Sequence, residues 1–339
     1  MKPLRRTAFS LALLAAIFIA ICKAMDNITV HNFIVADDRL TRAFAYLIIG
    51  GWTGFVFGLL FSRLFGKRIV DENFGGIVFR NSGMHRQAII AGAISAGSTL
   101  FMLLGNQLGD PSMLIALGSG TIIFTSIYDV VTKQAQFSNL ACPVLLVFVG
   151  SGLAAFGGSL AVTLAGILFI FFLSNGLDAF TKVAEQKGVR ASDGVNFFLW
   201  RFFYLTITGT VLAIVVSGIR GYSATLLETV ASGLKYIPFI ALTMFFVFLG
   251  ISLRLVAMKN TAISIVLIVF SVQIVLGYPI TLLGNWFLPG LFGEIPTKPW
   301  IWAVRLIGAI LIIGAICLLQ RQNLKKVKNV DDSAGGVAK

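Results

Sequence analysis

Long apolar stretches separated by short polar connections are the feature that most constrains the fold of this chain. Ten such stretches occur in its 339 residues, and a helix needs about 20 apolar residues to cross the roughly 30 Å hydrocarbon core of a membrane. None of them alternates polar and apolar residues, so helices are favoured over the strands of a membrane barrel. We therefore predict an all-α integral membrane protein with ten transmembrane helices, at residues 8–24, 43–65, 88–105, 113–131, 140–157, 160–177, 197–217, 237–253, 262–284 and 300–319.

Lys and Arg residues are distributed unevenly between the connections. Of the 27, 20 fall on the side of the membrane that holds the N-terminus, six fall on the other side, and Arg305 lies inside the last stretch. Acidic residues divide 8 to 6, so the asymmetry belongs to the basic residues, as the positive-inside rule requires. We expect a multi-pass protein of the plasma membrane, which in a bacterium is the inner membrane, with both termini in the cytoplasm. Insertion topology also accounts for the net charge of +13, and we expect no nucleic acid partner.

The first apolar stretch has a second interpretation. Lys2, Arg5 and Arg6 precede an apolar run that ends at Cys22-Lys23, an arrangement that also suits a signal peptide. Cleavage would leave nine spans. We favour retention because the internal repeat described next needs this helix.

Ten spans divide into five plus five, and an odd number per half places the halves in opposite orientations. Arg42 and Tyr46 at the start of the second stretch resemble Arg201 and Tyr204 at the start of the seventh. Similarity of this kind is typical of carriers with inverted repeats, although any two Arg–aromatic anchors at a membrane boundary look alike. We predict a first five-helix repeat at 1–158, a second, inverted five-helix repeat at 159–320, and a basic cytoplasmic tail at 321–339.

Short motifs in the second half resemble those of a known family. Gly293-Glu294-Ile295-Pro296-Thr297, followed by Trp300 and the small-residue run at 306–314, resembles the Gly-Glu turn before the last helix of the drug/metabolite transporter superfamily, whose EamA-like members are ten-span carriers. Residues 257–279 resemble the ninth span of that family with its proline. The likeness covers nearly the whole chain in span number and length, whereas several connections, including 285–298, are longer than is typical. It implies a substrate cavity between the two halves, mostly among spans one, three, four, six, eight and nine.

Residues that carry enzyme chemistry are scarce. The two histidines, His31 and His85, are expected on opposite sides of the membrane, and the three cysteines lie in separate apolar stretches. Neither a metal cluster nor a disulfide framework is therefore expected. The sequence contains no phosphate-binding loop of the Walker type. We expect no enzymatic activity and no cofactor.

Ionisable residues inside spans are the usual functional candidates, because each costs about 2.5–3.5 kcal/mol to insert. Asp129, Asp178 and Arg201 are expected at the cytoplasmic ends of spans, close to water. Arg305 has two interpretations: it extends to the membrane interface beside two tryptophans, or it contacts an anion in a cavity. We expect no carboxylate in the middle of the membrane, so no proton relay is predicted, and exchange or facilitated transport is favoured.

Uncharged polar residues at mid-membrane depth are the remaining candidates. Gln273 offers two donors and an acceptor, and Pro279 beyond it is expected to kink the ninth span and free backbone carbonyls. Such groups also serve as hydrogen bonds between helices, each worth about 0.6 kcal/mol. The substrate-binding residues that we predict are Gln273, Tyr278, Asn175, Ser119, Thr121 and Arg305.

The pattern as a whole predicts a carrier. We expect a transporter of small polar or amphipathic metabolites that works by alternating access around a midplane site, in export or exchange. The alternative is a lipid-facing flippase or a membrane subunit of a larger complex. The expected partners are a small-molecule substrate and membrane lipid, and a homodimer is left open.

Overall fold

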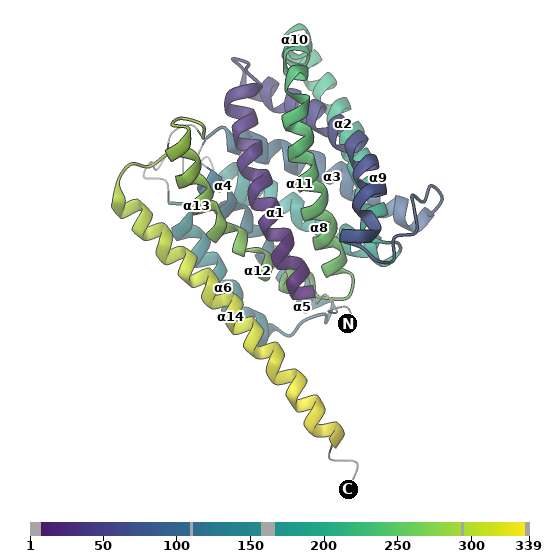
Figure 1. Ribbon diagram of the computed structural model, residues 1–339, viewed down its shortest axis with the longest axis vertical. Coiled ribbons are helices and arrows are strands. Elements are labelled where there is room, and N and C mark those ends of the chain that lie inside the picture. The colour runs from purple at the N-terminus through teal and green to yellow at the C-terminus, as the bar shows by residue number, and fades with distance from the viewer. Residues whose placement is uncertain (1–7, 109–110, 157–166, 293–294, 336–339) are drawn as a thin grey trace.

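A computed structural model describes residues 8–108, 111–156, 167–292 and 295–335 (Figure 1). Every regular element in these ranges is a helix. Eight helical segments are long and apolar enough to cross a membrane, and each overlaps one of the ten stretches predicted from the sequence. The chain is thus an all-α integral membrane protein. The eight segments are Ala8–Phe33, Arg39–Val70, Ser82–Asn106, Phe137–Ala154, Gly194–Ile219, Ser223–Met258, Ile263–Phe287 and Pro299–Arg321.

Some of these segments contain more than one helix, because an α-helix is followed in them by a short π- or 3-10-helical piece, labelled η. The helices are, in order, α1 (Ala8–Ile28), η1 (Thr29–Phe33), α2 (Arg39–Phe65), η2 (Gly66–Val70), α3 (Ser82–Asn106), α4 (Pro111–Leu117), η3 (Gly118–Gly120), α5 (Thr121–Val131), α6 (Phe137–Ala154), η4 (Ile167–Ser174), α8 (Asn175–Arg190), α9 (Gly194–Ile219), α10 (Ser223–Gly233), η5 (Leu234–Tyr236), α11 (Ile237–Met258), α12 (Ile263–Phe270), α13 (Val272–Phe287) and α14 (Pro299–Gly335).

Within the described residues, two of the ten predicted stretches do not form a long span of their own. The fourth contains the shorter apolar helix Ile115–Val131. The sixth, 160–177, is described only from residue 167, where η4 leads directly into α8. The boundary predicted between the halves, at 158/159, and the Gly293-Glu294 turn lie outside the described residues.

Polar residues in the connections determine where several helices begin. An Asp or Asn directly before the helix accepts a hydrogen bond from a backbone N–H of the first turn, which otherwise has no partner. The pairs are Asp38 with Thr41 before α2 (2.9 Å), Asn81 with Met84 before α3 (3.0 Å) and Asp193 with Asn196 before α9 (2.8 Å).

The ninth predicted stretch, 262–284, consists of two helices instead of one. Its two helices, α12 and α13, meet at Ser271, whose hydroxyl donates to the carbonyl of Ile268 at 2.6 Å. A serine hydroxyl that bonds the preceding turn competes with the helical hydrogen bonds and bends the helix. Beyond this point, α13 continues through Pro279.

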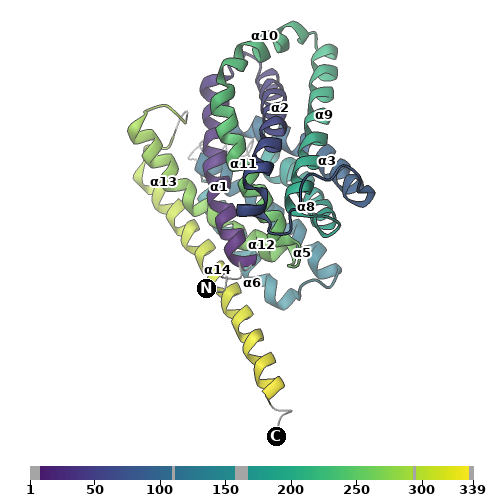
Figure 2. The ribbon, with the colours of Figure 1, turned by 45° about the vertical axis from the view of Figure 1, so that its right-hand side comes forward.

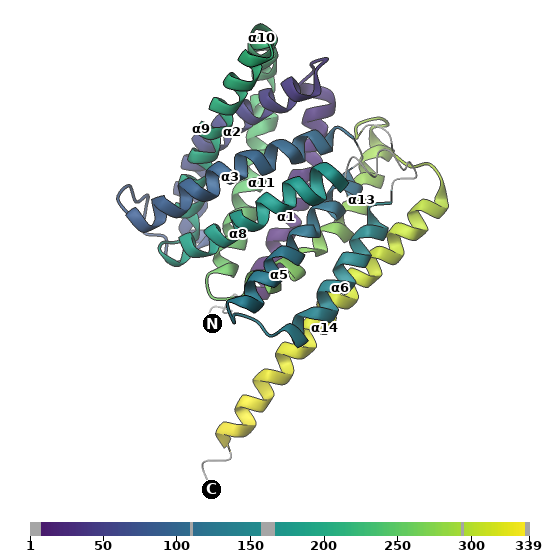
Figure 3. The ribbon, with the colours of Figure 1, turned by 180° about the vertical axis from the view of Figure 1, so that it is seen from behind.

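Five pairs of helices form the main contacts of the bundle. α1 lies beside α11, α3 beside α8 and α9, α2 beside α9, and α6 beside α14 (Figures 1 and 3). At one end of the bundle α10 connects α9 to α11 (Figure 2). At the other end lie the start of α1 and the end of α14 (Figure 1).

Glycines allow α6 and α14 to approach at backbone distance. A Cβ atom added to Gly150 would lie 2.7 Å from the carbonyl oxygen of Gly308, and one added to Gly308 would contact the carbonyl oxygen of Gly150. Small residues at such a contact are the usual basis of helix packing in membranes, where lipid tails remove the hydrophobic drive for association.

An exposed ion pair links α2 and α9 at the end of the bundle that carries α10. Arg220 Nη1 lies 2.9 Å from Asp38 Oδ2, and its hydrogen bonds lower the pKa of Asp38 to about 2. A depressed carboxyl pKa stabilises the fold at pH values above about 4, the ordinary value for aspartate. This contribution is lost as the pH falls through about 2, so the link persists at neutral pH.

We expect Gly308→Ala to lower the free energy of unfolding by about 1–3 kcal/mol, the usual cost of overpacking. The new methyl group would lie 2.7 Å from the backbone nitrogen of Ala154, which cannot move without shifting α6. Unfolding of the purified chain in detergent, followed by circular dichroism, measures the change. The control is Gly314→Ala, since no described atom lies within 4 Å of a Cβ at that position of α14. Equal effects of the two substitutions would contradict the close approach.

Candidate functional site

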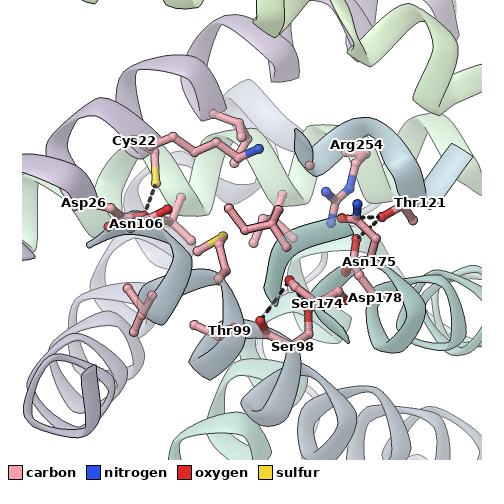
Figure 4. A pocket seen from close by; sticks show the side chains of 18 of the residues that line it. Cys22, Asp26, Ser98, Thr99, Asn106, Thr121, Ser174, Asn175, Asp178 and Arg254 are labelled. Atoms are coloured by element: carbon pink, nitrogen blue, oxygen red, sulfur yellow. Dashed lines mark hydrogen bonds between the residues drawn. The ribbon is translucent and has the colours of Figure 1, made fainter. Parts of the chain in front are cut away.

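A cavity of about 230 Å³ lies in the middle of the bundle. Its walls come from α1, α2, α3, η3, α5, η4, α8, α9, α11, α12 and α13, so segments from both ends of the sequence meet there. In Figure 4, Cys22 and Asp26 lie on one side of the cavity, whereas Arg254, Asn175 and Asp178 lie on the other. The wall combines charged and hydroxyl groups with apolar side chains, which suits a small amphipathic solute.

Glu185 is the centre of a buried ionic network at one side of this cavity. Its carboxylate lies 3.4 Å from Lys182 Nζ, 3.0 Å from Arg201 Nε and 3.2 Å from Arg254 Nη2. Lys182 also pairs with Asp178 at 2.6 Å. Glu185 is fully buried behind the wall, whereas its three cationic partners reach the cavity. The carboxylate therefore holds three positive charges in place from the side opposite the cavity.

The carboxylate on the other side of the cavity has hydroxyl and thiol partners instead of cations. Asp26 accepts a short hydrogen bond from the hydroxyl of Tyr46 and a second from Cys22 Sγ, four residues earlier in α1. Next to it, Asn27 and His31 contact the backbone carbonyl of Asn106, at 3.3 and 3.0 Å. These contacts join the end of the first helical segment, Ala8–Phe33, to the first part of α2 and to the end of α3.

Four of the six predicted substrate-binding residues line the cavity, namely Gln273, Asn175, Ser119 and Thr121. Asn175 spans a helix break: its side chain donates to the carbonyl of Leu117 at 2.8 Å and accepts from Thr121 at 3.3 Å. Ser119 donates to Ser151 at 2.5 Å. Gln273 is buried, and its Oε1 has no hydrogen-bond partner among the described residues, so an acceptor remains available at the wall.

The other two, Tyr278 and Arg305, lie outside the cavity wall. Arg305 is fully buried and donates to Ser112 Oγ at 2.6 Å and to the carbonyl of Phe156 at 2.9 Å. Its guanidinium also stacks 5.0 Å from the ring of Trp302. Arg305 therefore neither extends to the interface nor reaches the cavity, because α14 packs it against α4 and the end of α6.

The sequence predicts no carboxylate in the middle of the membrane, whereas the structure holds buried carboxylates at and behind the cavity wall. Asp26 and Glu185 are 7% and 0% exposed within their helices, and Arg201 is 5% exposed instead of lying near water. Asp129 is also fully buried and accepts from the backbone N–H of Ser264 at 2.6 Å, which caps α12. On the sequence, Asp26 and Glu185 follow apolar runs and look like boundary residues, but α1 and α8 continue past those runs into the bundle.

One signal in the sequence marks the missed residues. Asp178, Lys182 and Glu185 are spaced by four and three residues, which places them on one face of a helix. Lys23 and Asp26 are likewise three residues apart in α1. A charged face directly after an apolar run indicates a helix that continues into a polar interior, which the window of apolar residues alone does not reveal.

The described residues contain no group of three or more His, Cys, Asp or Glu side chains placed to hold a metal ion. The ionic cluster around Glu185, beside the cavity, mixes both signs of charge. What the site offers chemically is charge, hydrogen-bond donors and an apolar wall.

No protein-family model matches the chain, and no curated protein is significantly similar to it. The likeness to drug/metabolite transporters thus rests on span number and on short motifs. Function has to be argued from the geometry of the cavity.

We expect Glu185→Gln to lower the free energy of unfolding by about 3 kcal/mol, because loss of one partner leaves buried charges uncompensated. Unfolding of the purified chain in detergent measures this. The control, Glu72→Gln, removes the same charge from an exposed residue and should have little effect. Adding Arg254→Gln to Glu185→Gln should restore part of the loss. Equal stability of the two single variants would contradict the central role of Glu185.

Proposed function

We propose that this chain is a membrane transporter that moves a small polar or amphipathic metabolite by alternating access, in export or exchange. The main support for the proposal is a cavity in the middle of the helical bundle. Its wall, formed by many of the helices, combines charged and apolar side chains. Charged residues are costly at this depth and are retained in membrane proteins mainly along substrate or ion pathways. A carrier with a midplane site explains both the cavity and its charges.

We further propose ten spans arranged as two inverted repeats, at 1–158 and 159–320. The helix pairs support this arrangement. If span one corresponds to span six and span three to span eight, the contact of α1 with α11 is the counterpart of the contact of α8 with α3. The pairs α2–α9 and α6–α14 join spans two with seven and five with ten, and are their own counterparts, as a two-fold axis requires.

Hydrogen bonds at the span ends support the same symmetry. In the first half, His31 after span one contacts the carbonyl of Asn106, at the end of span three. In the second half, Gln186 near the end of span six donates at 3.2 Å to the carbonyl of Met258, at the end of span eight. The two contacts join equivalent elements in opposite orientations.

The interrupted fourth and ninth spans also correspond. Span four changes winding at Gly118–Gly120, and span nine at Ser271, and both points line the cavity. Discontinuous helices in equivalent positions of two repeats are characteristic of the binding sites of secondary transporters, since unwound backbone at membrane depth occurs where it lines a cavity.

The remaining sequence-based assignments fit this proposal. Both termini lie in the cytoplasm by the distribution of Lys and Arg, in the plasma membrane, or inner membrane, of the cell. The first span is retained, since α1 supplies Lys23 and Asp26 to the cavity. Placement among EamA-like carriers of the drug/metabolite transporter superfamily rests on the same ten-span, two-repeat arrangement.

Alternating access predicts that a cysteine in the cavity reacts from both sides of the membrane. We expect Thr99→Cys, in a variant with Cys22→Ala, Cys142→Ser and Cys317→Ser, to be labelled by a membrane-impermeant thiosulfonate applied to either face of oriented vesicles. Thr99 lines the cavity and is partly exposed. The control, Val211→Cys, lies on the outer surface of α9 in the middle of a span and should stay unlabelled. Labelling of Thr99→Cys from one face only, under every condition, would contradict alternating access.

A further inference from the structure

The positive charges around the cavity outnumber the negative ones. Four cations line it, Lys23, Lys182, Arg201 and Arg254, and they come from four different helices. On the same side lie two carboxylates, Asp178 in the wall and Glu185 behind it. On the opposite side, the carboxylate of Asp26 accepts hydrogen bonds from Tyr46 and Cys22. With every carboxyl group ionised, the side around Glu185 carries two more positive than negative charges.

Several donors of these cations are unused. Arg201 is 5% exposed, and its Nη1 has no hydrogen-bond partner among the described residues; the same holds for Nε of Arg254. A guanidinium has five N–H donors, and Glu185 and Ser95 occupy only part of those of Arg201. Because an unsatisfied donor of a buried cation is costly, an acceptor that reaches these N–H groups would stabilise the site.

Lys23 extends the unused positive charge into the cavity. Its Nζ makes no ion pair with any described residue, and it would lie 3.1 Å from a Cβ added to Gly118, where the fourth span changes winding. It therefore sits beside Gly118, next to the carbonyl of Leu117 that accepts a hydrogen bond from Asn175. An ammonium group with three free protons is a strong donor to an oxyanion.

The carboxylates do not offer an equivalent site for a cation. Asp178 is paired with Lys182 at 2.6 Å, and Asp26 is bonded by Tyr46 and Cys22. The rest of the wall supplies apolar contacts from residues such as Met102 and Leu267, together with the free acceptor of Gln273. This combination suits an anion with an apolar body and a hydroxyl or amide donor.

We propose that the cavity binds a small organic anion, whose oxyanion group, a carboxylate or a phosphate, is held by Lys23 and Arg201. The inference rests on the proposed transport function and specifies the substrate class of the same site. The anion neutralises the excess positive charge, so the loaded carrier reorients with less uncompensated charge than the empty one. Exchange of one anion for another is therefore the favoured mode.

The test measures thermal stabilisation of the full chain in detergent, at constant ionic strength, by a panel of solutes. Glycerol 3-phosphate, succinate and benzoate represent organic anions, and glycerol and choline represent neutral and cationic solutes. We expect anions to raise the unfolding temperature, because a ligand that binds only the folded state stabilises it. Stabilisation by choline or glycerol but by no anion would overturn the proposal.

Variants of Lys23 locate the binding. We expect Lys23→Met to weaken anion affinity about tenfold, the equivalent of losing one charge-assisted hydrogen bond, and Lys23→Arg to restore most of it. Because Lys23 has no ion-pair partner in the part of the chain that the structure describes, the substitution should not unfold the protein. The control, Lys67→Met, removes the same charge from an exposed residue. Equal anion affinity of Lys23→Met and Lys67→Met would overturn the assignment.

Two further experiments are needed. The first distinguishes a lipid headgroup from a free solute as the source of the anion, and the second distinguishes failure of the anion assignment from failure of the transport function. Nanodiscs with and without phosphatidic acid test whether a lipid headgroup supplies the oxyanion; stabilisation by that lipid, lost in Lys23→Met, supports the same site chemistry. Labelling of Thr99→Cys from both faces needs no knowledge of the ligand. If it alternates while anions do not bind, the anion assignment is wrong and the carrier stands; if it does not alternate, the transport function itself is wrong.

Discussion

The contact of Glu185 with three cations is the interaction on which the site depends. Four charged side chains inside an apolar bundle are tolerable only because each has a close partner, and removal of one would leave the others uncompensated. Through Glu185, the network joins α8, α9 and α11, which are spans six, seven and eight of the proposed second half. It also orients three cations toward the cavity, so the same bonds that stabilise the helices prepare the binding surface.

The ion pairs at the cavity lie within the proposed second half, and hydrogen bonds connect the two halves. Asp26 and Tyr46 join spans one and two, and the Glu185 network joins spans six to eight. Between the halves, some hydrogen bonds involve a charged group, such as Arg201 with Ser95 at 2.8 Å, and others join hydroxyl groups, such as Ser98 with Ser174 at 3.2 Å. Neutral hydrogen bonds of this kind are worth about 1 kcal/mol each and are easily exchanged for water.

Polar cavity residues that lie within apolar runs were predictable from the sequence, whereas charged residues just beyond those runs were not. Asn175, Ser119, Thr121 and Gln273 stand inside long apolar windows, where a polar group at mid-depth is conspicuous, and all four line the cavity. Glu185 follows its apolar run and looks like a boundary residue. Whether a helix stops at the end of such a run or continues into the bundle depends on charged partners from other helices, which no local pattern contains.

The sequence by itself determined that the chain is a helical membrane protein, because the length and number of apolar stretches leave few other solutions for backbone groups in lipid. It also determined the uneven distribution of Lys and Arg between the connections. Only the tertiary structure decided which polar groups share a cavity. Arg305 and Arg201 are both arginines near span ends, yet one is packed against Ser112 and the other reaches the cavity. The difference comes from which helix faces pack together, a property of the whole bundle.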